Sequence, residues 1–267
     1  MQKIKMIVCD IDGTLVQDYE QGFDPRLFDQ IRAFLAAGVK FTVATGRQYP
    51  NLAHIFKPFI NDAYMISENG SCIFFKDELL EAAAMPMPDV YALIDAITAV
   101  PDCEPMISAP RFGYYSHPSA SFQANLARLS GFVMHEVANF RDIVPPVVKV
   151  TAFVSTDSAA PVPYLTEPWS KKFNMAIAGE HWLDFNPSNK GEAVAKLATR
   201  LNLTPDEVLI FGDNFNDIEM LKFTKNSFAM PHSAPPVIAA AGLGVCDNIG
   251  DYLAELLKNR CCLKTSK

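Results

Sequence analysis

The sequence predicts an α/β protein in which a doubly wound parallel sheet carries an inserted α+β domain. Short apolar runs alternate with helical patterns over residues 5–67, which is typical of a parallel sheet covered by helices on both faces. The alternation returns after 182–186, whereas residues 85–181 are rich in proline and contain only short strand-like and helix-like pieces. We therefore expect a core formed by residues 1–84 and 182–267, with the inserted domain at 85–181.

The first half of the core begins with an apolar run at 5–9 that is rich in Ile and Val, as in a buried parallel strand. A helix is expected at 23–37, because apolar residues recur at helical spacing between the capping pair Asp24-Pro25 and the terminating Gly38. The elements that follow are a strand at 39–44, a helix at 49–56, a strand at 63–67 and a hairpin of 72–75 with 79–83.

After the insert, a helix is expected to open at 187–192 and to continue through Leu201. A strand at 208–211 follows, and it again ends in acidic residues. Another helix, a strand near 227–230 and a terminal helix at 249–257 complete the core. The two ends of the chain therefore build one sheet.

Composition excludes several classes of protein. The 267 residues are 49% hydrophobic and 20% charged, which indicates a globular chain. The formal net charge of −7 argues against nucleic acid as a partner, because phosphate backbones are bound by basic surfaces. No apolar run has membrane-spanning length and no signal-peptide pattern is present, so we expect no membrane partner and a cytoplasmic location. The six cysteines form no C-x-x-C pair, so we expect neither a disulfide framework nor a zinc site.

Polar residues of a few types follow three of the predicted strands and begin one predicted helix. They are Asp10 and Asp12, Thr45-Gly46-Arg47, Lys190, and Asp213 with Asn216 and Asp217. In a doubly wound sheet these strand ends converge on one crevice. Several carboxylates near one point form an oxygen site suited to Mg²⁺, whereas a lysine, a hydroxyl and backbone amides hold phosphoryl oxygens. We therefore expect Mg²⁺ and a phosphorylated ligand there.

The order of these motifs resembles that of the haloacid dehalogenase-like (HAD) superfamily of phosphohydrolases, and in particular its Cof-type branch. The resemblance covers nearly the whole core, and the insert falls where that branch carries a C2-type cap domain. It implies a Rossmann-like HAD core with an inserted α+β cap. The matching motifs are Asp10-Ile11-Asp12-Gly13-Thr14-Leu15, Thr45-Gly46-Arg47, Glu68-Asn69-Gly70, Asn189-Lys190-Gly191 and Gly212-Asp213-Asn214-Phe215-Asn216-Asp217-Ile218-Glu219-Met220.

The resemblance also implies a role for each site residue. Asp10 would be the nucleophile that forms an aspartyl-phosphate, and Asp12 would protonate the leaving oxygen and then activate water. The metal would be held by the side chains of Asp10 and Asp213 and by the backbone carbonyl of Asp12. Asp217 would position Lys190 or a metal-bound water. The phosphate would be bound by the Ile11 amide, Thr45, Gly46, Lys190 and Asn216.

Two features leave alternatives open. Arg47 is either a phosphate or cap contact or a member of a structural ion pair. Where the family usually has Ala-Met-Gly-Asn-Ala, this chain has Ala229-Met230-Pro231-His232-Ser233. Proline removes a backbone donor and the freedom of glycine, so we expect altered loop geometry and specificity, with a loop or helix-cap role for His232.

The expected function is that of a magnesium-dependent phosphatase, a phosphoric monoester hydrolase acting on small phosphorylated metabolites such as sugar phosphates, nucleotides or cofactor phosphates. One alternative is a phosphomutase or a narrowly specific sugar-phosphate phosphatase of the same superfamily. An alternative of another class is a phosphoacceptor signalling protein or a non-catalytic phosphate-binding protein. The position of Asp10 after the first strand argues against a signalling receiver, and the joint presence of Asp10, Asp12, Lys190 and Asp213 argues against lost catalysis.

Overall fold

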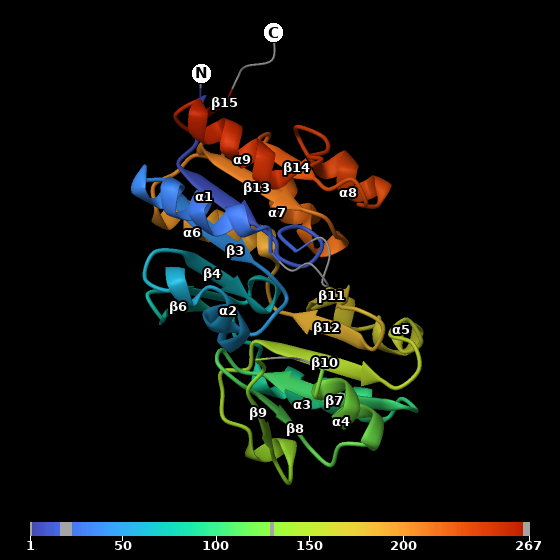
Figure 1. The fold of residues 1–267 in the computed structure, drawn as a ribbon. Coiled ribbons are helices and arrows are strands. Elements are labelled where there is room, and N and C mark those ends of the chain that lie inside the picture. The colour runs from blue at the N-terminus through green and yellow to red at the C-terminus, as the bar shows by residue number, and fades with distance from the viewer. Residues whose placement is uncertain (1, 17–22, 129–130, 264–267) are drawn as a thin grey trace. The chain divides into compact units, whose positions relative to one another are not determined.

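The computed structural model describes residues 2–16, 23–128 and 131–263 of the chain (Figure 1). The described residues fall into two compact units. The first unit takes its residues from 1–45, 59–66 and 190–267, and the second takes its residues from 46–58 and 67–189. The predicted insert at 85–181 lies inside the second unit, and its boundaries stay a prediction.

Five parallel strands form the sheet of the first unit. Their spatial order is β14 (Ser227–Ala229), β13 (Val208–Gly212), β2 (Met6–Cys9), β3 (Lys40–Ala44) and β4 (Tyr64–Ser67). Apart from Lys40, every residue of these strands is buried, as expected for a parallel sheet covered on both faces. The predicted α/β class with a parallel sheet is confirmed.

Helices follow the strands of this unit. In α1 (Pro25–Ala36), the predicted cap forms: the Arg26 amide donates a hydrogen bond to the carboxylate of Asp24. Just beyond this helix, Gly38 has a φ of +80°, which favours glycine. The later helical elements are α6 (Lys190–Arg200), the 3₁₀ turns η5 (Pro205–Glu207) and η6 (Phe215–Asp217), α7 (Ile218–Lys222), α8 (Pro235–Ala240) and α9 (Ile249–Lys258).

The two ends of the chain meet in this unit. Helices α1 and α9 pack side by side, and they carry nearly opposite ends of the colour range in Figure 1. The short strands β1 (Gln2–Lys3) and β15 (Cys262–Leu263) pair antiparallel. Among the described residues, no helix combines the length and the apolar character needed to cross a membrane.

The second unit contains a six-stranded sheet in which only the last pair of strands, β8 and β9, is parallel. Its order is β11 (Asn174–Ile177), β12 (Trp182–Asn186), β10 (Lys149–Val154), β7 (Cys103–Ser108), β8 (Gly113–Tyr115) and β9 (Met134–Glu136). Strand β12, after which we expected the core pattern to resume, is itself paired with β10 and β11. The buried aromatic residues Tyr114, Phe122 and Phe153 belong to the core of this unit.

The remaining elements of the second unit include the expected hairpin, formed by β5 (Cys72–Phe75) and β6 (Glu78–Ala82). The main helices are α2 (Tyr49–Ile55), α3 (Met87–Thr98), α4 (Ala120–Leu126) and α5 (Val162–Leu165). The 3₁₀ turns are η1 (Lys57–Phe59), which ends at the border of the two units, η2 (Glu68–Gly70), η3 (Phe140–Asp142) and η4 (Trp169–Lys171).

Candidate active site

Predicted catalytic residues lie where three strands of the first unit end. Cys9, the last residue of β2, pairs with Phe211 of β13 and with Val43 of β3. Because the three strands are parallel, their carboxyl ends lie at one edge of the sheet, where open α/β sheets place their ligands. The residues that follow these ends are Asp10 after β2, Asp213 after β13 and Thr45 after β3.

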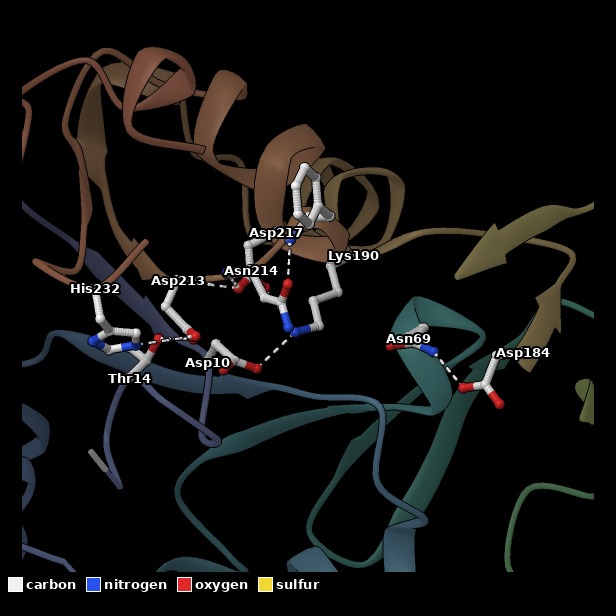
Figure 2. Close-up of polar contacts among 10 residues, drawn as sticks. Asp10, Thr14, Asn69, Asp184, Lys190, Asp213, Asn214, Asp217 and His232 are labelled. Atoms are coloured by element: carbon white, nitrogen blue, oxygen red, sulfur yellow. Dashed lines mark hydrogen bonds and ion pairs between the residues drawn. The ribbon is translucent and has the colours of Figure 1, made fainter. Parts of the chain in front are cut away.

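Lys190, the first residue of α6, forms two ion pairs (Figure 2). Its Nζ atom lies 2.6 Å from Oδ1 of Asp10 and 2.7 Å from Oδ1 of Asp217. The exposed fractions of the three side chains are 1%, 5% and 0%, so water does not screen these contacts. Burial disfavours the charged ammonium, but the two carboxylates outweigh it and raise the pKa of Lys190. Lys190 therefore stays a cation between two acids.

Gly191 explains how the start of α6 reaches this position. A Cβ atom at Gly191 would lie 2.6 Å from the backbone carbonyl of Glu219 in α7. Without a side chain, the first turn of α6 packs directly against the start of α7, just after Asp217. The Lys-Gly pair of the motif thus has a steric reason as well as a chemical one.

Both oxygens of the Asp217 carboxylate are already engaged. Oδ1 pairs with Lys190, while Oδ2 accepts hydrogen bonds of 2.9 Å from the backbone amides of Asp213 and Asn214. A carboxylate used in this way holds its neighbours rather than an incoming ligand. This arrangement supports the prediction that Asp217 positions Lys190.

Two side chains from other segments contact the carboxylate of Asp213. The hydroxyl of Thr14 donates to Oδ1 at 2.7 Å, and Nε2 of His232 lies 3.3 Å from Oδ2 (Figure 2). The loop that carries Thr14 also passes very close to Asp213 at Gly13, where any Cβ atom would overlap the carboxylate. Gly13 has a φ of +86°, so glycine is favoured there by both conformation and space.

The charges at the strand ends fit a divalent cation. Asp10, Asp213 and Asp217 each offer a carboxylate oxygen, and these oxygens lie within 4.8 Å of one another. Burial raises the pKa of Asp10 well above its ordinary value, although the neighbouring Lys190 acts in the opposite direction. An oxygen-only donor set that is short of positive charge is the kind that Mg²⁺ occupies. Asp217 is fully buried and holds an ammonium and two backbone amides, whereas Asp213 is partly exposed and Asp10 follows the neighbouring strand end, so Asp10 and Asp213 are the better suited ligands.

Other predicted residues have the following places. Ile11 and the partly exposed Asp12 lie in the tight loop after β2, which is closed by a hydrogen bond from the Val16 amide to the Ile11 carbonyl. Asn216 lies in η6, beside Asp217. Gly46 and Arg47 open the second unit, where Nη1 of Arg47 donates to Oδ1 of Asn51 at 3.0 Å. Lys190 thus links Asp10 to Asp217, and Asp217 in turn holds the backbone amide of Asp213. The roles of the whole set of site residues stay predictions.

Sequence reasoning assigned no site role to Thr14 and set His232 aside as a loop residue. Both contact Asp213, a predicted metal ligand. Thr14 belongs to the first motif, and its hydroxyl could have been noticed as a donor for a nearby carboxylate. The signal for His232 was the departure from the usual loop sequence at 229–233, because the replacement put an imidazole next to a strand end.

Comparison with known proteins identifies the class. A model of the haloacid dehalogenase-like hydrolase family matches residues 7–251. The match covers most of the chain, so the chain belongs to this family, and the predicted resemblance to its Cof-type phosphatases is confirmed.

Several of the relatives are named as phosphatases. The 5-amino-6-(5-phospho-D-ribitylamino)uracil phosphatase YbjI of Escherichia coli is 23% identical over 275 residues, covering 96% of this chain and 97% of the relative. The pyridoxal phosphate phosphatase YbhA of the same organism is 23% identical, covering 95% of this chain and 97% of the relative. A solved structure from Eubacterium rectale is 30% identical, with a TM-score of 0.84, and the alignment covers 95% of this chain and 99% of that chain. The chain is therefore a phosphatase, an enzyme of phosphoryl transfer.

Proposed function

We propose that this phosphatase hydrolyses small phosphorylated metabolites with the help of Mg²⁺ and through an aspartyl-phosphate on Asp10. The observation that carries the proposal is the buried Lys190 ammonium, which bridges Asp10 and Asp217 at the end of a parallel strand. A fixed cation beside a carboxylate nucleophile attracts the negative oxygens of a phosphoryl group and stabilises the charge that spreads over them during transfer.

The reaction has two steps. In the first, an oxygen of Asp10 attacks phosphorus, and the bond from phosphorus to the leaving oxygen breaks as Asp12 gives that oxygen a proton. In the second, Asp12 takes a proton from water, whose oxygen attacks the phosphorus of the aspartyl-phosphate. The bond from phosphorus to Asp10 breaks, inorganic phosphate leaves, and both aspartates return to their starting states.

Binding of the phosphoryl oxygens is assigned to Lys190, Thr45, Asn216 and the backbone amides of Ile11 and Gly46. Lys190 contributes charge, whereas the hydroxyl, carboxamide and amides contribute directed donors. Asp217 keeps Lys190 in place through the 2.7 Å contact and so acts on the phosphate indirectly. Arg47 is proposed as a further support of the phosphate or of the cap.

The side chains of Asp10 and Asp213 and the backbone carbonyl of Asp12 would hold Mg²⁺. When bound, the ion neutralises negative charge on the carboxylates and the phosphoryl group. Thr14 and His232 support this role by fixing both oxygens of Asp213, and Gly13 supports it by letting the loop pass close to the same carboxylate. His232 thus acts on Asp213 and not on the substrate.

Named relatives support the substrate class. The two Escherichia coli enzymes are named for a phosphorylated ribitylamino-uracil and for pyridoxal phosphate, which are both small phosphorylated molecules. We propose substrates of that size, with residues 85–181 as the cap domain that selects among them. The cytoplasmic location expected from the sequence stays a prediction.

A panel of sugar phosphates, nucleotides and cofactor phosphates tests this function, with each substrate assayed with Mg²⁺ and with a chelator. We expect release of inorganic phosphate from part of the panel, and its loss with chelator. Conversion of a sugar phosphate into its isomer without phosphate release would instead identify a phosphomutase. No release from any substrate, at full Mg²⁺ saturation, would contradict the proposal.

A further inference from the structure

One motif of the family has no role so far: Glu68-Asn69-Gly70, which forms η2 directly after β4. Glu68 and Asn69 have φ values of +51° and +54°, in the left-handed region. Asparagine tolerates this region, whereas glutamate rarely adopts it because its Cβ atom crowds the backbone there. Both side chains are also buried. A local conformation that is strained and buried requires an explanation from the contacts that it makes.

These contacts lead to the segment that follows Thr45. The Glu68 amide donates to the carbonyl of Arg47 at 3.1 Å. The side chain of Asn69 lies against Gly46, where a Cβ atom would come within 2.9 Å of its Oδ1 atom. The turn therefore packs on both residues of the Gly46-Arg47 pair.

Asn69 is itself held in one orientation. Its Nδ2 atom donates to Oδ2 of Asp184 at 3.0 Å and to Oδ1 of Asn186 at 3.1 Å, both in β12 (Figure 2 shows the first contact). Asn186 returns a hydrogen bond of 3.0 Å to the carbonyl of Glu68. The carboxamide is planar, so the two acceptors that fix Nδ2 also fix Oδ1. The Oδ1 atom is thereby held facing Gly46.

Lys149 completes the arrangement from β10. Its Nζ atom lies 2.6 Å from Oε2 of Glu68 and 3.5 Å from Oδ2 of Asp184, and it donates to the carbonyl of Gly46 at 3.3 Å. We call Glu68, Asn69, Lys149, Asp184 and Asn186 the Gly46 clamp. The clamp contacts the carbonyl of Gly46 and occupies the space where a Cβ atom on Gly46 would lie.

Stability does not explain the clamp. It buries one ammonium and two carboxylates, whose side chains are at most 4% exposed. The loss of hydration of such groups often cancels the attraction between them, so a buried ion cluster is weak evidence of stabilisation. Burial raises the pKa of Glu68 although Lys149 opposes the change, whereas the two carboxylates outweigh burial and raise the pKa of Lys149, so the charges of the clamp act in both directions. The Lys149 ammonium is engaged by Glu68, Asp184 and the carbonyl of Gly46.

We propose that Glu68, Asn69 and Lys149 are positioning residues that hold Gly46 in the conformation in which its amide binds phosphate. This inference rests on the proposed function, which assigns the Gly46 amide to the phosphoryl group. It gives the Glu-Asn-Gly motif a role and adds a lysine from the six-stranded sheet that no motif contains. Substrate binding then depends on a buried side chain that never touches the substrate.

Two variants test the clamp, and both are read by two measurements. Lys149→Met removes the ammonium but keeps most of the stem, and Asn69→Gly removes the carboxamide while suiting a φ of +54°. The first measurement is the inhibition constant of inorganic phosphate, which should rise at least about tenfold, equivalent to about 1.4 kcal/mol. The second is the NMR order parameter of the Gly46 amide, which should fall from about 0.85 toward 0.6.

Matched controls separate positioning from general loss of stability. Leu93→Ala opens a cavity in the core of the same unit and should lower the melting temperature without changing either measurement. Lys172→Met removes an exposed ion pair with Asp89 in the same unit and should change neither. Asn69→Gly keeps every charge of the clamp and suits the φ of +54°, so it decides the question even where Lys149→Met does not fold.

The outcomes are distinct. A wild-type inhibition constant and order parameter in Asn69→Gly would overturn the clamp while leaving the phosphatase proposal intact. If the unchanged protein neither releases nor binds phosphate, the proposed function fails, and with it the phosphate part of this inference. A rigid Gly46 in both variants would overturn the positioning role whatever the activity, because the order parameter needs no turnover.

Discussion

Asp217 joins two motifs through one carboxylate: its Oδ1 atom lies 2.7 Å from Nζ of Lys190, and its Oδ2 atom accepts a hydrogen bond from the Asp213 amide. A single buried side chain thus fixes both the cation proposed to bind the phosphate and the backbone that carries a proposed metal ligand. This relationship explains why the two motifs are needed together. Because of these contacts, we expect some substitutions at the site to affect both folding and turnover and others to affect turnover alone.

Replacing Lys190 should affect folding as well as activity. In Lys190→Met, two buried carboxylates lose their common cation, which should lower the free energy of unfolding by about 3–5 kcal/mol. Urea denaturation measures the change. Lys222→Met is the control, because Lys222 forms an exposed ion pair with Glu219 and should alter the same quantity by less than about 1 kcal/mol. Equal effects of the two variants would show that the buried contacts are unimportant.

Replacing Asp10 should abolish turnover without unfolding the protein. Asp10→Asn keeps the shape of the side chain but removes the nucleophilic anion, and Lys190 retains Asp217 as a partner. We expect phosphate release at the rate of a protein-free blank and an unchanged circular dichroism spectrum. Turnover clearly above that blank would remove Asp10 from the role of nucleophile.

Mg²⁺ should stabilise the folded protein, because it relieves the excess of negative charge among three close carboxylates. At a hundred times the dissociation constant the gain should be about 2.7 kcal/mol, which is visible as a rise in melting temperature. Asp213→Ala should remove the rise, whereas Asp206→Asn, at an exposed ion pair with Lys225, should keep it. A rise of the same size in Asp213→Ala would contradict the assignment of this ligand.

Gly13 should tolerate no side chain. Gly13→Ala combines strain at a φ of +86° with overlap of the new methyl group and the Asp213 carboxylate, so it should lose the stabilisation by Mg²⁺ and the activity. Gly38→Ala is a matched control, because Gly38 has a φ of +80° and open space around the position of a Cβ atom. It should show only the strain, about 1–2 kcal/mol in urea denaturation. If the two variants keep the same Mg²⁺ stabilisation and the same activity, the close approach of Gly13 to Asp213 is not needed for metal binding or turnover.

Asp12 should act in both halves of the reaction. Asp12→Ala should slow turnover by roughly 100- to 10,000-fold, the usual contribution of general acid–base catalysis. A nitrophenyl phosphate needs little protonation of its leaving group, so its first step should suffer less than the second. Rapid-quench measurements should then show a burst of nitrophenol and accumulated phosphoenzyme. The absence of a burst, with equal losses for activated and unactivated substrates, would contradict the two roles.

The sequence by itself determined the parallel sheet, the class of enzyme and the residues at the strand ends. This was possible because these features are local: a buried parallel strand is a short run of Ile and Val, and the residue proposed for catalysis follows it directly, as Asp10 follows Met6–Cys9. The cap of α1 at Asp24 was predictable for the same reason, since a helix cap involves only neighbouring residues.

Only the tertiary structure decided which side chains share a partner. Thr14 and His232 hold Asp213, and Lys149 reaches the carbonyl of Gly46, yet none of these pairs has a spacing that a sequence pattern can register. The pairing of β12 with β10 was equally hidden, because nothing in the short run Trp182–Asn186 specifies which strand it will pair with. Contacts between distant segments depend on how the layers pack, and packing is a property of the whole fold.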